Sequence, residues 1–151
     1  MKRALFSLLT VLLLAGGCVN KGVQWQAYTP EAFDAAKKSG QPVVLLFSAA
    51  WCPTCYEMKE TTFTDTRVIN ELTPFQRIKA DMSFRYSPKI QELGRQFRIQ
   101  GYPTLLFYDP QGEEIGDLRA IGLLTADQLL DVLSEIRRRY PGIAAAPLAP
   151  S

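Results

Sequence analysis

The 151-residue sequence contains no histidine and only three cysteines. A structural zinc site takes about four ligands, usually Cys or His, so the sequence disfavours zinc and predicts no metal site. It also lacks an apolar run of the roughly 20 residues that a membrane-spanning helix needs. Charge is nearly balanced, with 17 Lys and Arg against 15 Asp and Glu. Without a basic stripe, nothing favours nucleic acid as a partner.

The first residues have the pattern of a leader for export. Lys2 and Arg3 make the start of the chain basic, and residues 4–15 form an apolar stretch, broken only by Ser7 and Thr10, that is too short to span a bilayer. Small residues then lead to Cys18, and this resembles the lipobox of bacterial lipoproteins, although Ala15 stands where leucine is usual. We therefore predict a lipoprotein-type signal peptide over residues 1–17 and a lipid anchor on Cys18. The alternative is ordinary secretion with Cys18 as a free thiol.

The number of cysteines agrees with export. Pairing Cys52 with Cys55 leaves Cys18 odd, and lipidation explains an odd cysteine in an exported chain. Val19 follows Cys18, where the lipoprotein sorting rule reads Asp as a signal for inner-membrane retention. The resemblance therefore implies the periplasmic side of a bacterial envelope, at the outer membrane if the cell is Gram-negative. Disulfides form in such a compartment.

The motif WCPTC, residues 51–55, lies between a strand pattern and a helix pattern. The apolar run 43–47 suits a strand that is buried on both faces. Pro53 suits the first turn of a helix, which places Cys52 at the N-cap. The free backbone N–H groups and the helix dipole at that end favour a thiolate on Cys52. A thiolate beside a second thiol performs thiol–disulfide exchange without an organic cofactor, because the thiols carry the electrons. A structural disulfide, half of a zinc site and two inert thiols are the alternatives.

The remaining chain alternates strands and helices, which indicates one α/β domain over residues 25–140. Strands are expected at residues 25–28, 43–47, 76–82, 104–108 and, returning antiparallel, 113–120. Helices are expected at residues 30–39, 53–60, 66–72 and 88–97. A last helix is expected to start at Thr125, where Thr125 and Gln128 form a capping box, and to carry an apolar stripe as far as residue 136. A polar tether over residues 18–24 precedes this domain. The Pro/Ala-rich residues 141–151 follow it, and we expect this tail to be disordered.

This order of elements, with crossovers, then a hairpin and a closing helix, resembles the thioredoxin fold. The resemblance becomes specific where WCPTC at 51–55 is combined with GYPT at 101–104. From about residue 42 to residue 136 the chain resembles the C-terminal periplasmic domain of the DsbD thiol:disulfide interchange proteins. Small lipid-anchored thioredoxin-like proteins of bacterial envelopes are expected to be similar. The expected fold class is therefore α/β, a thioredoxin fold with a central mixed β-sheet flanked by helices.

The resemblance also implies roles for single residues. Cys52 would be the exposed attacking thiol and Cys55 the buried resolving thiol. Pro103 would be a cis-proline beside the pair, and would present the backbone of Tyr102 to an extended substrate strand. The tyrosine ring could equally be a half-buried surface aromatic. The substrate-binding residues implied are Trp51, Pro53, Thr54, Tyr102 and Pro103.

The function implied is that of a thiol:disulfide oxidoreductase which reduces, or relays electrons to, disulfides of envelope proteins. Its partners would be these proteins and an upstream thiol reductant, for which a membrane thiol transporter is the natural expectation, and the chain would be a monomer. Thr54 offers a hydroxyl where the strongly oxidising DsbA type has a histidine, so a milder, more reducing couple is expected. A disulfide oxidase or isomerase would share all these residues. A non-catalytic thioredoxin-like adaptor or metallochaperone is the alternative from another class.

One departure from the family concerns the proton acceptor for the buried thiol. Leu46 stands where thioredoxins and the DsbD domain have a buried Asp, and Lys59 stands where the DsbD domain has a further acid. Glu57 could substitute through water, although both Glu57 and Lys59 also suit a solvated helix face. An apolar side chain beneath Cys55 disfavours its thiolate by desolvation. We therefore expect slower resolution of mixed disulfides.

Overall fold

The computed structural model describes residues 22–143, and these form a five-stranded mixed sheet with the order β1-β3-β2-β4-β5. Its strands are β1 (Gln26–Ala27), β2 (Val43–Ser48), β3 (Gln76–Asp81), β4 (Thr104–Tyr108) and β5 (Ala120–Ile121). β1 and β2 run parallel to β3, whereas β4 runs antiparallel to β2 and β5 antiparallel to β4. This is the mixed α/β sheet that the sequence predicts.

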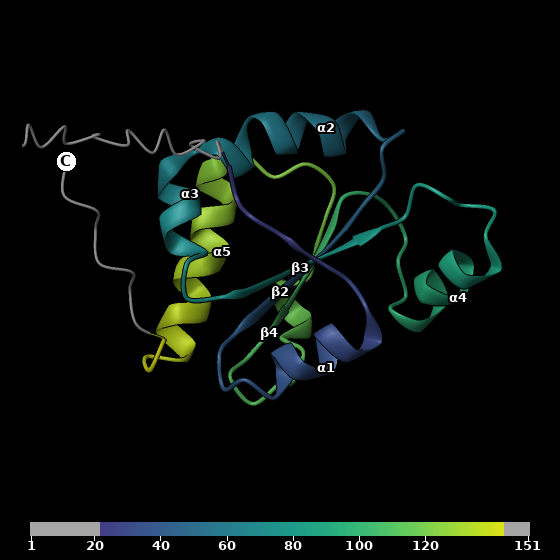
Figure 1. The fold of residues 1–151 in the computed structure, drawn as a ribbon. Coiled ribbons are helices and arrows are strands. Elements are labelled where there is room, and N and C mark those ends of the chain that lie inside the picture. Colours follow the sequence, from purple (N-terminus) through teal and green to yellow (C-terminus); the bar gives the residue numbers. More distant parts are fainter. Residues whose placement is uncertain (1–21, 144–151) are drawn as a thin grey trace, which may run out of the picture.

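Helices lie on both sides of this sheet. They are α1 (Pro30–Lys37), α2 (Pro53–Glu60), α3 (Thr66–Glu71), α4 (Pro88–Gln96) and α5 (Ala126–Arg139), with the 3₁₀ helices η1 (Thr62–Thr64) and η2 (Gly116–Leu118). Figure 1 shows α3 and α5 on one side of the strands, α1 and α4 on the other, and α2 along the top of the view. The element order therefore places α2, which carries the cysteine pair, directly after the central strand β2.

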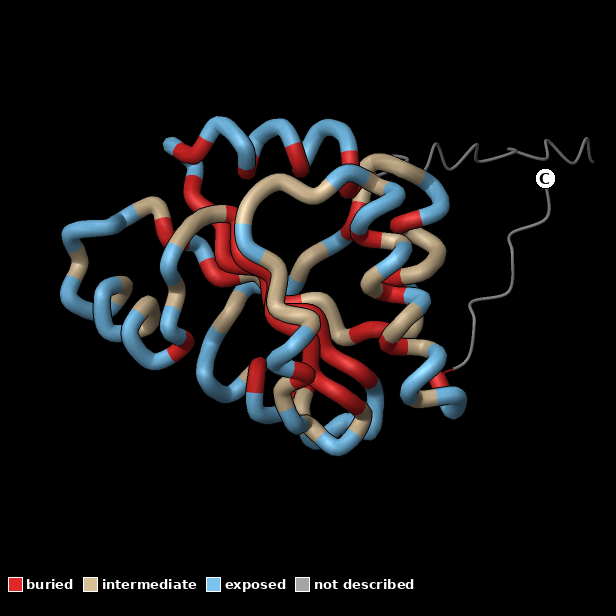
Figure 2. Tube along the Cα trace, turned by 180° about the vertical axis from the view of Figure 1, so that it is seen from behind, coloured by how far each residue is buried: buried red, intermediate tan, exposed pale blue. Residues whose placement is uncertain are grey.

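The core consists of two clusters, one on each face of β2. Successive strand residues point to opposite faces, so Val44 and Leu46 join one cluster with α3 and α5. Val43, Leu45 and Phe47 join the other with α1. Figure 2 shows the buried residues gathered in the central strands and the exposed residues on the outer turns of the helices. The buried strand predicted over residues 43–47 is confirmed. Its packing in the core fixes the position of the WCPTC motif, which follows the end of the strand.

The predicted helix starts are confirmed by their capping contacts. The side chain of Thr125 accepts from the backbone N–H of Gln128 at 3.3 Å, and the side chain of Gln128 accepts from the N–H of Thr125 at 2.9 Å. This reciprocal pair is the capping box expected there. Thr29 caps α1 by accepting from Ala32 N at 3.1 Å. Local sequence signals therefore placed these helix starts correctly.

The antiparallel strand predicted over residues 113–120 is mostly absent. Glu114 makes an isolated bridge to Tyr108, η2 follows, and regular pairing is confined to β5. The Arg119 side chain donates to Glu114 at 2.7 Å and to the carbonyl of Phe97 at 2.9 Å. These contacts tie Arg119 to the end of α4. The backbone N–H of Ile115 still donates to the carbonyl of Phe107 in β4 at 2.8 Å, so the return along β4 is antiparallel but is interrupted by η2.

Several predictions concern the ends of the chain. The signal peptide at 1–17, the lipid site at Cys18 and residues 144–151 lie outside the described residues. Val23 and Ile143, just beyond the predicted domain range of 25–140, are buried in the first core cluster. The packed part of the chain therefore extends slightly further than predicted. Within the described residues, no helix has the length and apolar character needed to cross a membrane.

Candidate active site

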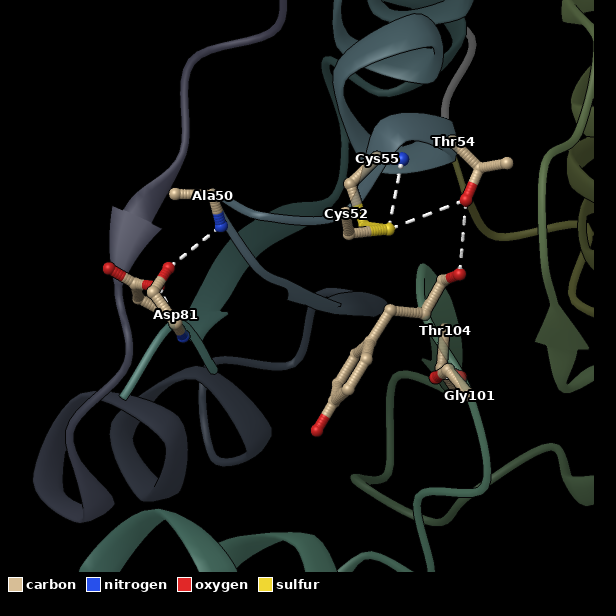
Figure 3. Close-up of a disulfide and its surroundings, with 9 residues drawn as sticks. Ala50, Cys52, Thr54, Cys55, Asp81, Gly101 and Thr104 are labelled. Carbon is tan, nitrogen blue, oxygen red and sulfur yellow. Dashed lines mark hydrogen bonds between the residues drawn. A yellow bond between two sulfur atoms is a disulfide. The ribbon is translucent and has the colours of Figure 1, made fainter. Parts of the chain in front are cut away.

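Cys52 and Cys55 form a disulfide at the start of α2, with their Cα atoms 5.2 Å apart. Cys52 is the N-cap of this helix and Pro53 occupies its first turn, as predicted. The backbone N–H of Cys55 donates to Cys52 Sγ at 3.2 Å, a contact that Figure 3 shows as a dashed line. An N–H donor at a helix start stabilises negative charge, so reduction would leave the Cys52 thiolate in a favourable place.

The prediction that Cys52 is an exposed thiol is wrong for this disulfide form. Cys52 is 5% exposed, which is close to the 6% of Cys55. Thr54 Oγ1 lies 3.3 Å from Cys52 Sγ, and the same hydroxyl donates to the carbonyl of Tyr102 at 3.3 Å. The motif alone revealed the position of Cys52 on the helix, but not which groups lie over its sulfur. Thr54 is itself exposed, so a partner that contacts it comes close to the sulfur.

The GYPT segment lies against the cysteine motif although the two are far apart in the sequence. The Tyr102–Pro103 peptide bond is cis, as the resemblance implied. Thr104 Oγ1 donates to the carbonyl of Gly101 at 2.7 Å and closes the turn. The ring of Tyr102 packs edge-on against that of Trp51, with the centroids 5.6 Å apart. Burial raises the pKa of Tyr102 above its usual value, which keeps the phenol neutral at the site.

Two residues that the sequence reasoning missed hold Trp51 in place. The indole N–H of Trp51 donates to the carbonyl of Ser83 at 2.9 Å, and the N–H of Ala50 donates to Ser83 Oγ at 2.8 Å. Asp81 in turn accepts from the N–H of Ser83 at 2.9 Å. Because β2 and β3 are parallel neighbours, the loops that follow them meet at one edge of the sheet. The available signal was an Asp-x-Ser sequence, residues 81–83, at the end of the predicted strand.

Leu46 is 3% exposed and packs in the core, so an apolar side chain fills the position of the family's buried acid. Leu46 and Cys55 both line a cavity of about 710 Å³, whose other lining residues include the charged Lys79 and Asp81. Lys59 also lines it, but its ammonium group pairs with Glu60 at 2.9 Å, which raises the pKa of Lys59. Lys59 therefore belongs to an exposed, paired helix face.

Glu57 is exposed on α2, which fits a solvated helix face. Between residues 22 and 143, no three Cys, Asp or Glu side chains are grouped as ligands for a metal ion. The polar atoms in contact with Cys52 Sγ are the Cys55 N–H and the Thr54 hydroxyl. The arrangement therefore suits chemistry at the two sulfur atoms.

Comparison with known proteins gives a family and several relatives. A family model described as a thioredoxin-like domain matches residues 29–137. The thiol:disulfide interchange protein DsbD of Haemophilus ducreyi is 36% identical over 97 residues, which are 64% of this chain and 17% of that protein. DsbD of Ralstonia nicotianae is 35% identical over 132 residues, 87% of this chain and 21% of the relative. The chain thus spans about a fifth of the length of these relatives.

Solved structures show the same architecture. The solution structure of a thioredoxin from Thermus thermophilus is 30% identical, with a TM-score of 0.60 over 76% of this chain and 87% of that chain. The oxidised C-terminal domain of DsbD from Neisseria meningitidis is 24% identical, with a TM-score of 0.58 over 71% of this chain and 90% of that chain. The thioredoxin fold expected from the sequence is confirmed.

Proposed function

The chain belongs to the thioredoxin-like domain family, and from that premise we propose that it exchanges disulfides with other proteins through Cys52 and Cys55. The observation that carries this proposal is the disulfide at the N-terminus of α2, beside the cis bond of Tyr102 and Pro103. The identity to DsbD proteins, which are named as thiol:disulfide interchange proteins, supports the same chemistry. Trp51, Pro53 and Thr54 are the exposed groups around the pair that a partner would contact first.

The reaction proceeds in two exchange steps. The Cys52 thiolate attacks one sulfur of the partner's disulfide, which forms a mixed disulfide and releases the partner's other sulfur as a thiolate. Cys55 loses its proton and attacks Cys52 Sγ, which releases the reduced partner and closes the Cys52–Cys55 disulfide. Two electrons pass to the partner in this cycle. An upstream thiol reductant must then return two electrons to the pair.

The second step lacks the buried carboxylate that would accept the Cys55 proton. The cavity shared by Leu46 and Cys55 offers a route by which solvent takes that proton. Leu46 also adds an apolar side chain to the lining of this cavity, and this raises the free energy of a Cys55 thiolate by desolvation. Resolution of the mixed disulfide is therefore slower than it would be with an acid at this position.

Reduction or electron relay is the proposed direction. The side chain of Thr54 contacts Cys52 Sγ with a neutral hydroxyl, which stabilises a thiolate less than a positive charge would. The reduced form is therefore less favoured, and the couple is more reducing. The proposed setting is the periplasmic side of a bacterial envelope, with the chain held by a lipid on Cys18 after removal of residues 1–17. A membrane thiol transporter would be the upstream reductant, and the chain would act as a monomer.

The test is covalent trapping in the cell. A Cys55→Ser variant cannot complete the second step, so partners should accumulate on Cys52 as adducts that a reductant dissolves on non-reducing gels. The control carries Cys52→Ser as well and should trap nothing. An empty trap in the single variant would favour the non-catalytic adaptor.

A measured reduction potential decides the direction. A value near the roughly −270 mV of thioredoxin agrees with reduction, whereas a value near the roughly −120 mV of DsbA would reverse the assignment to an oxidase.

A further inference from the structure

A groove of about 500 Å³ begins at Tyr102, beside the cysteine pair. We call it the basic groove, because its lining includes Arg85, Arg95 and Arg98. Ile90 and Ile99 supply apolar surface, and none of the described residues that line it is acidic. A groove of this composition attracts carboxylates on a partner.

Two of the three arginines keep their charge available. Arg95 pairs with Glu92 at 2.6 Å, so its charge is largely offset within α4. Among residues 22–143, neither Arg85 nor Arg98 forms an ion pair. Both are exposed. The free positive charge of the basic groove is therefore that of Arg85 and Arg98.

Arg85 is held at the rim of the redox site. Its guanidinium carbon lies 5.3 Å from the centre of the Trp51 ring and 4.9 Å from that of Tyr86, which are cation–π distances. The side chain of Gln91 donates to the carbonyl of Arg85 at 3.3 Å and ties this loop to α4. Trp51 packs on Tyr102, so the basic groove is continuous with the surface around the cysteines.

We propose that the basic groove binds an acidic, extended segment of the partner protein next to its reactive cysteine. This inference rests on the proposed function and names the class of substrate that it prefers. A partner strand at Tyr102 advances about 3.3 Å per residue, so residues close to its cysteine reach the groove. Carboxylates there pair with the guanidinium groups of Arg85 and Arg98, which match them in a planar, bidentate geometry.

The experiment measures the rate of attack by Cys52 on three synthetic peptides. Each contains one cysteine activated as a mixed disulfide with thionitrobenzoate, and the residues that flank the cysteine on both sides are Glu, Lys or Gln. Attack by the thiolate joins the peptide to Cys52 and releases coloured thionitrobenzoate, which reports the rate. The reduced full chain is used, and the rate of a Cys52→Ser variant is subtracted. The wild type should prefer the Glu peptide to the Lys peptide by about five-fold at low salt, since two exposed ion pairs are involved.

Charge reversal tests the two arginines. Arg98→Glu should lower the preference, and Arg85→Glu combined with Arg98→Glu should invert it. Added salt should reduce the wild-type preference. Among the contacts of the described residues, Arg85 stacks on Trp51, whereas Arg98 neither stacks on Trp51 nor makes a hydrogen bond to Cys52. The single Arg98→Glu variant therefore changes the charge of the basic groove without removing a contact of the redox site.

Lys38→Glu is the matched control. Lys38 is exposed at the end of α1, close to the end of the sheet that lies opposite the cysteines. This variant should keep the wild-type ratio of the rates for the Glu and Lys peptides. Equal rates for the Glu and Lys peptides, or an unchanged ratio in the double variant, would refute the binding of acidic segments by the basic groove. Neither result would contradict disulfide exchange. Failure of the wild type to react with the neutral Gln peptide would instead count against the proposed function.

Discussion

The hydroxyl of Thr54 can donate its single proton to one acceptor at a time, and two acceptors lie within reach. They are the carbonyl of Tyr102 and Cys52 Sγ, each at 3.3 Å. In the disulfide form the carbonyl is the stronger acceptor, whereas a Cys52 thiolate would be stronger than the carbonyl. Thr54→Val retains the shape of the side chain and removes this donor. We expect the pKa of Cys52 to rise in the variant.

The size of the rise follows from the two bonds. A hydrogen bond to a charged group contributes about 1.5–3 kcal/mol, and the neutral bond available to the thiol form contributes about 0.5–1.5 kcal/mol. The difference is about 1–1.5 kcal/mol, which corresponds to about one pKa unit. The backbone N–H of Cys55, at 3.2 Å, remains in place and limits the change. The same free energy makes the couple more reducing by about 30 mV.

The assay follows the ultraviolet absorbance of the thiolate in the reduced protein as the pH is changed, together with the rate of alkylation of Cys52. Thr54→Ser keeps the hydroxyl and is the matched control, with a pKa close to that of the wild type. A valine variant whose Cys52 pKa is unchanged or lower would refute the reasoning, because the hydroxyl would then contribute nothing to the thiolate.

Two further predictions concern stability. Gly112 has φ of +85°, and an added Cβ would lie 2.9 Å from the carbonyl oxygen of Lys37, so Gly112→Ala should lower the free energy of unfolding in urea by about 1–3 kcal/mol. Gly116→Ala meets no heavy atom within 4 Å and should change it little; equal effects would contradict the steric argument. Hydrogen bonds from two arginines at the end of α5 lower the pKa of Glu135 from 4.5 to about 2. Because that pKa is depressed, its contribution to stability is complete above pH 4.5 and is lost as the pH falls towards about 2. Urea unfolding across this pH range should therefore show a weaker pH dependence for Glu135→Gln than for the wild type, and identical curves would disprove the linkage.

Much of the fold could be predicted because its signals are local. Thr125 and Gln128 cap α5 through contacts within one helical turn, and Pro53 places Cys52 at the start of α2 in the same way. The run 43–47 is buried on both faces of a central strand, which an uninterrupted apolar pattern indicates. The segment 113–120 was predicted only in part: it pairs antiparallel with β4 at Glu114 and at Ala120, but η2 interrupts it between them. Its Arg119 side chain contacts the end of α4, a distant element that no local pattern reveals.

By itself, the sequence determined the cysteine pair, its place at a helix start and the absence of an acid at position 46, since each depends on neighbours along the chain. Only the tertiary structure decided that Thr54 lies between Cys52 and the carbonyl of Tyr102, that Ser83 holds Trp51, and that Arg85 and Arg98 line one groove beside the site. The physical reason is that exposure and charge at a site depend on which distant loops meet there. Those meetings follow from the order and direction of the strands, because parallel neighbours such as β2 and β3 bring their final residues to the same edge of the sheet.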